Sequence, residues 1–95
     1  MKIEKTPEMM RIASRLAWFI SPEEAIEQPQ LLLTQVMTLG TIEDVLTVRQ
    51  AVGLDEFRKV LDSASPGAFD PRSWAYWNLI CGRRTAPPLP SRQIP

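Results

Sequence analysis

The chain has 95 residues, of which 44% are hydrophobic, and its eleven basic and eleven acidic side chains cancel. This length fits one domain with a single hydrophobic core, and the composition excludes wholesale disorder. The one cysteine excludes an internal disulfide, and no apolar run is long enough to cross a bilayer, so we expect a cytoplasmic protein with no membrane contact.

Proline and capping residues mark the first two helices. Thr6-Pro7-Glu8 is typical of a helix start, and apolar residues at helical spacing follow it. Trp18 and Phe19 widen that apolar stripe, which predicts a first helix in contact with more than one neighbour. Ser21-Pro22-Glu23-Glu24 matches a capping box and starts a short second helix, which Pro29 should end.

Three further helices are predicted between residues 30 and 64. The third ends at Gly40, for which we predict the left-handed conformation of a helix C-terminus. Thr41, with an acid three residues later, starts the fourth helix, and Gly53 ends it. One side of the fourth helix carries Ile42, Val45, Leu46, Arg49 and Val52. The inner face of the fifth helix carries Phe57, Val60, Leu61 and Ala64.

Nine consecutive positions near the end of the chain hold four of the seven aromatic residues. A final helix is predicted there, because Asp70 is a good N-cap and Pro71 fits the first helical position. We interpret Trp74 and Trp77 as core residues and Tyr76 as the aromatic edge left at the surface. A partner-binding hot spot is the alternative interpretation of these aromatic residues.

The charges are unevenly distributed along the chain. Residues 1–20 hold four basic and two acidic groups, and residues 21–70 hold three basic and nine acidic groups. Residues 71–95 hold four basic groups and no acidic group. Arg72 should pair with an acid such as Asp70.

The segment Pro87-Pro88-Leu89-Pro90 has the general form of a polyproline ligand, although a proline-rich end without a binding role has the same composition. Alternatively, the arginines of this tail lie across an acidic groove of this chain or of a partner.

The predicted elements define the fold class. No segment alternates with period two, and no hairpin signal occurs. The sequence therefore predicts an all-α fold, a compact bundle of five or six short helices with tight connections. We expect residues 1–82 to form this helical domain and residues 83–95 to form an extended, proline-rich tail.

Groups that commonly carry catalysis are missing from the sequence. There is no histidine and only one cysteine, so the usual zinc sets and a Cys/His nucleophile pair are excluded. The four glycines stand alone at predicted helix ends, so no phosphate-binding loop is present. The acid pairs lie in first helical turns, where the helix dipole favours them: Glu23-Glu24, Glu43-Asp44 and Asp55-Glu56. We therefore predict a protein that is not an enzyme and needs no cofactor or metal.

The helices on either side of Gly40 could also form a helix-turn-helix that represses its own operon. A recognition helix should offer basic or amide side chains to a DNA groove, whereas this one begins with Glu43 and Asp44. A DNA-binding autoregulator is therefore the alternative hypothesis, and a homodimeric scaffold is a third.

The chain resembles a family of small, mostly uncharacterised bacterial proteins in three segments: Ser21–Ala25, Gln35–Val45 and Phe69–Trp77. That family has a V-hydrophobic-x-x-G-x-x-E-D helix junction followed by an S/D-P-R-S/T-x-x-x-W helix start. The resemblance covers about residues 15–82 and carries over Gly40, Glu43, Asp44, Pro71, Arg72 and Trp77. The family is often encoded beside a nucleotidyltransferase-like toxin of the abortive-infection type, so the resemblance implies an antitoxin-like role.

Residues and resemblance together predict a non-catalytic protein-interaction module, an antitoxin-like partner of a nucleotidyltransferase-type toxin. We expect the aromatic edge at Tyr76 and the basic tail to dock on that partner, with the tail approaching its metal-binding carboxylates. The predicted partner-binding residues are Arg72, Tyr76, Trp77, Arg83, Arg84 and Arg92.

Overall fold

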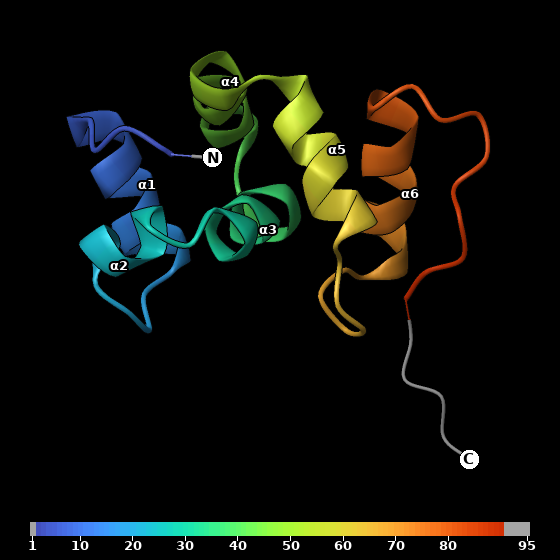
Figure 1. The fold of residues 1–95 in the computed structure, drawn as a ribbon, viewed down its shortest axis with the longest axis horizontal. Helices are drawn as coiled ribbons and strands as arrows, with labels where there is room; N and C mark the ends of the chain where they lie inside the picture. Colours follow the sequence, from blue (N-terminus) through green and yellow to red (C-terminus); the bar gives the residue numbers. More distant parts are fainter. Residues whose placement is uncertain (1, 91–95) are drawn as a thin grey trace.

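Six α-helices follow one another in the computed structural model, which describes residues 2–90 (Figure 1). Their bounds are Pro7–Leu16 (α1), Pro22–Ile26 (α2), Pro29–Leu39 (α3), Ile42–Val52 (α4), Leu54–Asp62 (α5) and Pro71–Ile80 (α6). The prediction of a compact all-α fold is confirmed for this part of the chain.

Four of the six helices begin with a side-chain cap, as the sequence predicts. Thr6, Ser21, Thr41 and Asp70 each accept a hydrogen bond from the backbone N–H three residues later. Such caps satisfy donors that have no partner within the helix, and each typically stabilises a helix by about 1 kcal/mol. Helices α1, α2, α3 and α6 also carry proline in the first turn. Local chemistry therefore sets most of the helix starts.

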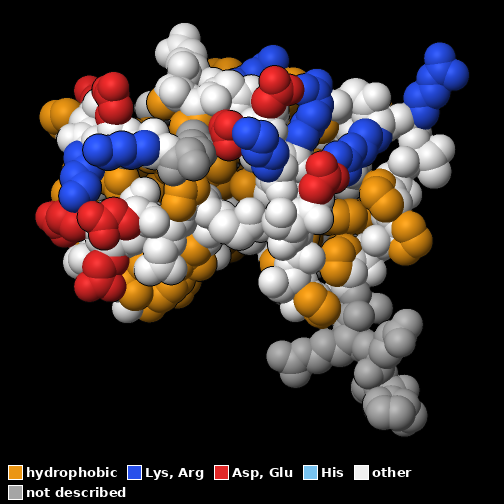
Figure 2. All heavy atoms as spheres, in the orientation of Figure 1, with side chains coloured by type: hydrophobic (Ala, Val, Ile, Leu, Met, Phe, Trp, Pro, Cys, Tyr) orange, Lys and Arg blue, Asp and Glu red, His pale blue; other side chains and the backbone are white. Residues whose placement is uncertain are grey.

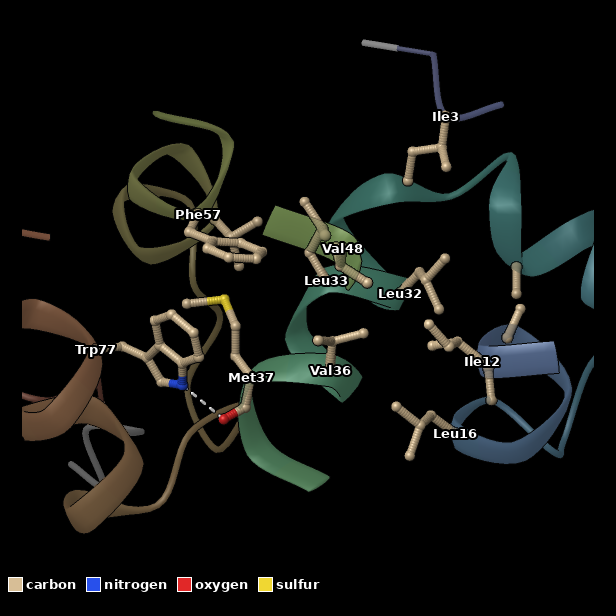
Figure 3. Packing of buried hydrophobic residues seen from close by; sticks show 14 of the residues in the cluster. Ile3, Ile12, Leu16, Leu32, Leu33, Val36, Met37, Val48, Phe57 and Trp77 are labelled. Atoms are coloured by element: carbon tan, nitrogen blue, oxygen red, sulfur yellow. Dashed lines mark hydrogen bonds between the residues drawn. The ribbon is translucent and has the colours of Figure 1, made fainter. Parts of the chain in front are cut away.

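Helix α3 is central, because each of the other five helices contacts it. Its buried residues are Leu32, Leu33, Val36 and Met37. Figure 3 shows these side chains facing two ways, toward Ile12 and Leu16 of α1 on one side and toward Phe57 and Trp77 on the other. A helix covered on several sides needs apolar residues around much of its circumference, and α3 supplies them.

Helices α5 and α6 pack beside each other at the opposite end of the molecule from α1 and α2 (Figure 1). The predicted inner face of α5 is confirmed for Phe57, Val60 and Leu61, which are buried. Ala64 lies beyond the end of the helix and is partly buried. The rings of Phe57 and Trp77 meet edge to face with centroids 5.0 Å apart. This arrangement fixes the face of α6 that points into the core.

The left-handed conformation predicted for Gly40 is wrong. Gly40 is extended, with φ −72° and ψ 157°. A Cβ atom at this position would lie 2.5 Å from the carbonyl oxygen of Val36, which is closer than packed atoms approach. Glycine is needed here because the chain passes directly over that carbonyl between α3 and α4, and not because of its backbone angles.

Helix α1 ends at Leu16, before the two aromatic residues that the sequence analysis assigns to its stripe. Trp18 and Phe19 lie in the turn to α2, where Trp18 is 68% exposed and the two rings meet edge to face. Residues 17–20 form bends and turns, and Ser21, which precedes a proline, is extended. The helix does contact several neighbours, α2, α3 and α4, but through its buried residues Met9, Ile12, Ala13 and Leu16.

Residues 83–90 contain no helix or strand and pass beside α6 (Figure 1). The indole N–H of Trp74 donates to the carbonyl oxygen of Pro87 at 2.7 Å. Ala86 and Leu89 pack partly buried against the core. The rest of the predicted tail, residues 91–95, lies outside the described residues, so its extended form stays a prediction.

No helix in residues 2–90 is both long and apolar enough to cross a membrane.

Candidate functional site

A groove of ≈ 520 Å³ lies between α4 and α6. Its α4 wall is made of Ile42, Val45, Leu46 and Arg49, and its α6 wall of Arg72, Ser73, Tyr76 and Ile80. Met37 of α3 and Trp77 of α6 also line it, and both are buried. No Cα atoms of α4 and α6 come within 8 Å of each other in residues 2–90, so the two walls stand apart over this buried floor.

The α4 wall contains four of the five residues that the sequence analysis groups on one side of this helix, and of these four only Val45 packs against the core. Val48 is the fully buried apolar residue of α4, and Asp44 is buried beside it. Ile42 is 78% exposed and Leu46 is 54% exposed. Helix α4 therefore has one apolar side that packs against the bundle and a second that is open to solvent in the groove.

The α6 wall is fixed by the way its aromatic residues divide between core and surface. Trp77 is only 3% exposed, and its indole N–H donates to the carbonyl oxygen of Met37 at 2.7 Å (Figure 3). Tyr76 is 54% exposed and rests edge to face on the Trp77 ring, with centroids 5.5 Å apart. Tyr76 is thus the surface aromatic that the sequence predicts, and the buried indole beneath it holds it in place.

Arg49 and Arg72 line the groove, and no acidic side chain of residues 2–90 lines it with them. Within the same range, neither guanidinium forms an ion pair. The predicted pair between Arg72 and Asp70 is wrong, because the Asp70 carboxylate accepts from the backbone N–H of Ser73 instead. Hydrogen bonds from Ser73 accordingly hold the pKa of Asp70 below its usual value.

Six of the other eight basic side chains in residues 2–90 form an ion pair. Basic and acidic side chains lie next to one another over α4 and α5 on the face drawn in Figure 2. On α5 itself, Arg58 pairs with Asp55 and Lys59 with Glu56. The two groove arginines differ from these surface charges because they adjoin exposed apolar side chains and lack a carboxylate within residues 2–90.

The two arginines stand on opposite walls of the groove. Arg72 lies in the first turn of α6. Arg49 lies in the second half of α4. With 1.5 Å of rise per residue, the α6 wall from Arg72 to Ile80 is about 12 Å long.

The predicted site residues fall into two groups. The groove brings together Arg72, Tyr76 and Trp77, with Trp77 in its floor. Arg83 lies apart from them, where it is held by the side chains of Asn78 and Asp62 of its own chain. Arg84 is exposed in the segment after α6, and Arg92 lies outside the described residues.

Sequence reasoning missed the buried carboxylate of Asp44. Both of its oxygens accept from the guanidinium of Arg15, 29 residues earlier, and one also accepts from the Thr41 backbone N–H at 2.8 Å. The hydrogen bond from Arg15 is the main reason that the pKa of Asp44 lies below its usual value. The sequence indicates that Asp44 caps this helix together with Thr41, but nothing near Asp44 in the sequence indicates an ion pair with a residue of another helix. Of the two acids at the start of α4, Asp44 is therefore buried and Glu43 is exposed.

The nucleophilic and metal-binding side chains form no second site in the part of the chain that the structure describes. The thiol of Cys81 is buried, and its raised pKa keeps it protonated at neutral pH, whereas the thiolate is the reactive form. No three side chains of the His, Cys, Asp and Glu types gather closely enough in residues 2–90 to hold a metal ion. The groove remains the feature with the clearest functional geometry.

Comparison of the chain with protein-family models, with curated proteins and with solved structures finds no match.

Proposed function

We propose that this chain is a non-catalytic protein-interaction module and that the groove between α4 and α6 is its docking surface. The observation that carries the proposal is a set of exposed side chains around one groove with a buried floor: Ile42, Leu46 and Tyr76. Scattered exposed apolar residues are normal, but a contiguous patch beside a pocket is typical of an interaction site. Tyrosine and arginine are also the residue types that concentrate binding energy at interfaces.

The absence of catalysis is part of the proposal. The one thiol is buried and protonated, and the buried Asp44 carboxylate is occupied by Arg15 and the helix cap. A general base or nucleophile must reach a substrate in a suitable protonation state, and neither group does so. Their arrangement favours structural roles for both.

The partner we propose is a nucleotidyltransferase-type toxin, which makes the protein antitoxin-like. This step is based on the resemblance in the three sequence segments. Gly40, Arg72 and Trp77 are among the positions which that resemblance carries over, and all three line the groove. In this proposal Arg84 and Arg92 provide a second contact through the tail, which approaches the acidic site of the enzyme.

A site-specific photocrosslinking experiment in the native host tests the proposal. The photoreactive residue p-benzoylphenylalanine replaces Leu46 in the groove or, as a matched control, Leu79, which is 67% exposed on α6 but does not line the groove. A third position, Arg84, tests the tail. We expect a covalent adduct from position 46 and none from position 79, with a nucleotidyltransferase-fold protein identified in the adduct by mass spectrometry.

The possible outcomes separate the parts of the proposal. An adduct from position 46 with a different protein supports the interaction module and rejects the toxin. An adduct with a second copy of the chain points to the homodimeric scaffold. Equal yields from positions 46 and 79, or no adduct from position 46, would contradict the assignment of the groove. Absence of an adduct from position 84 would remove the tail from the interface.

A further inference from the structure

We propose that the groove between α4 and α6 binds an acidic amphipathic α-helix of the partner protein, two to three turns long. This inference rests on the proposed function and names the occupant of the same site. The apolar walls, the length of the groove and the two arginines in its lining each define one property of that occupant.

The walls define an apolar face on the occupant. Ile42 and Leu46 on α4 face the groove from one side and Tyr76 and Ile80 on α6 from the other. An apolar ridge between them would contact both walls and the buried floor. On a helix, apolar residues spaced i, i+3 or i+4, and i+7 form such a ridge.

A helix suits this groove better than an extended segment does. Both walls are helices, whose backbone groups are already bonded within each helix, and Thr41 and Asp44 further cap the start of α4. An extended peptide would bury its own N–H and C=O groups against apolar side chains without partners, which is costly. A helical peptide satisfies these groups internally and presents only side chains to the groove.

The arginines define the charge of the occupant. Arg49 and Arg72 lack an acid partner within residues 2–90, so carboxylates of a ligand would meet two uncompensated charges. The α6 wall from Arg72 to Ile80 is about 12 Å long, so a helix of two to three turns spans it. One acid for each guanidinium, placed beside the apolar ridge of the occupant, would form charge-assisted bonds, which are among the stronger polar contacts.

The same geometry disfavours a nucleic acid in the groove. A phosphate backbone is bound by a row of basic groups, whereas this lining has two arginines among mostly apolar side chains. The first turn of α4 also carries Glu43 at the surface, beside Ile42. A second copy of the chain remains an alternative occupant that the experiment must separate.

A peptide-display selection on the purified protein tests the occupant directly. The library consists of 16-residue helix-forming peptides with random side chains on one face and at the flanking positions. We expect enrichment of apolar residues at i, i+3 or i+4, and i+7, with two acids at the flanking positions. The measured Kd of an enriched peptide should weaken at least ten-fold with the double variant Arg49→Glu, Arg72→Glu. It should stay within two-fold with Arg11→Glu, a basic-to-acidic change at an exposed position of α1 outside the groove.

A charge-swap measurement completes the test. Replacing the two acids of the peptide by lysine should abolish binding to the wild-type protein and restore it to the double variant. Enrichment of basic or uncharged sequences, no enrichment of any helical sequence, or equal binding by the double variant would overturn the inference. So would light scattering that shows a dimer which Leu46→Glu dissociates. If crosslinking from position 46 still captures a partner, only the acidic helix is wrong and the proposed function stands.

Discussion

Replacing Trp77 by alanine should destabilise the protein by about 3–5 kcal/mol, which is most of the stability of a typical small domain. The side chain is buried, packs edge to face on Phe57 and donates to the Met37 carbonyl oxygen. In a domain of this size the loss corresponds to a fall in Tm on the order of 20 °C. Urea unfolding followed by circular dichroism measures the change.

Two further variants separate the contributions of Trp77. Trp77→Phe keeps an aromatic ring against Phe57 but leaves the buried Met37 carbonyl without its donor, so we expect a smaller loss of about 1–3 kcal/mol. Tyr76→Ala, at the adjacent and half-exposed position, should cost no more than about 1 kcal/mol. If Tyr76→Ala destabilised the protein as much as Trp77→Ala, the division of α6 into core and groove sides would be wrong.

Replacing Asp44 by alanine should be the second large effect, about 2–3 kcal/mol. The change removes one half of the capping box with Thr41 and leaves Arg15 without its carboxylate. The cost stays below that of a fully buried ion pair because Arg15 is half exposed and can be solvated. Glu43→Ala, one residue earlier and exposed, is the matched control and should change the free energy of unfolding by less than about 0.5 kcal/mol.

The effect of Asp44 should also depend on pH in one direction. Arg15 holds the folded-state pKa of this carboxyl below its ordinary value of 3.8. The stabilisation by the charged form is therefore fully present above that ordinary value and is lost as the pH falls through the lower, folded-state pKa. The difference in unfolding free energy between wild type and Asp44→Asn should be constant from pH 5 to 8 and shrink below pH 4. A difference that grows on acidification would contradict the assigned pair.

Much of the fold could be predicted because helix starts are encoded locally. Thr6, Ser21, Thr41 and Asp70 cap the helices that follow them, as the sequence indicates. The error at Gly40 concerns the detailed geometry of a helix end, which the residue type alone does not determine. Gly40 is required by the carbonyl oxygen of Val36, not by a left-handed turn.

The site could be predicted only in part, because contacts between residues far apart in sequence form it. Helical spacing places Ile42, Leu46 and Arg49 on one side of α4, but spacing alone does not say whether that side meets another helix or solvent. That is decided by how α4 and α6 are both packed on α3, which depends on contacts between residues far apart in sequence. The pair between Arg15 and Asp44, 29 residues apart, was missed for the same reason.

Nuclear magnetic resonance of the three indole N–H groups tests most directly whether the groove is the docking surface. The indole of Trp77 lies in the floor of the groove, that of Trp74 donates to Pro87, and Trp18 is exposed in the turn between α1 and α2. On titration with a peptide selected on the protein, the Trp77 signal should shift while the Trp18 signal stays unchanged. A shift of Trp18 with an unchanged Trp77 signal would place the binding surface at the turn between α1 and α2 and contradict the account.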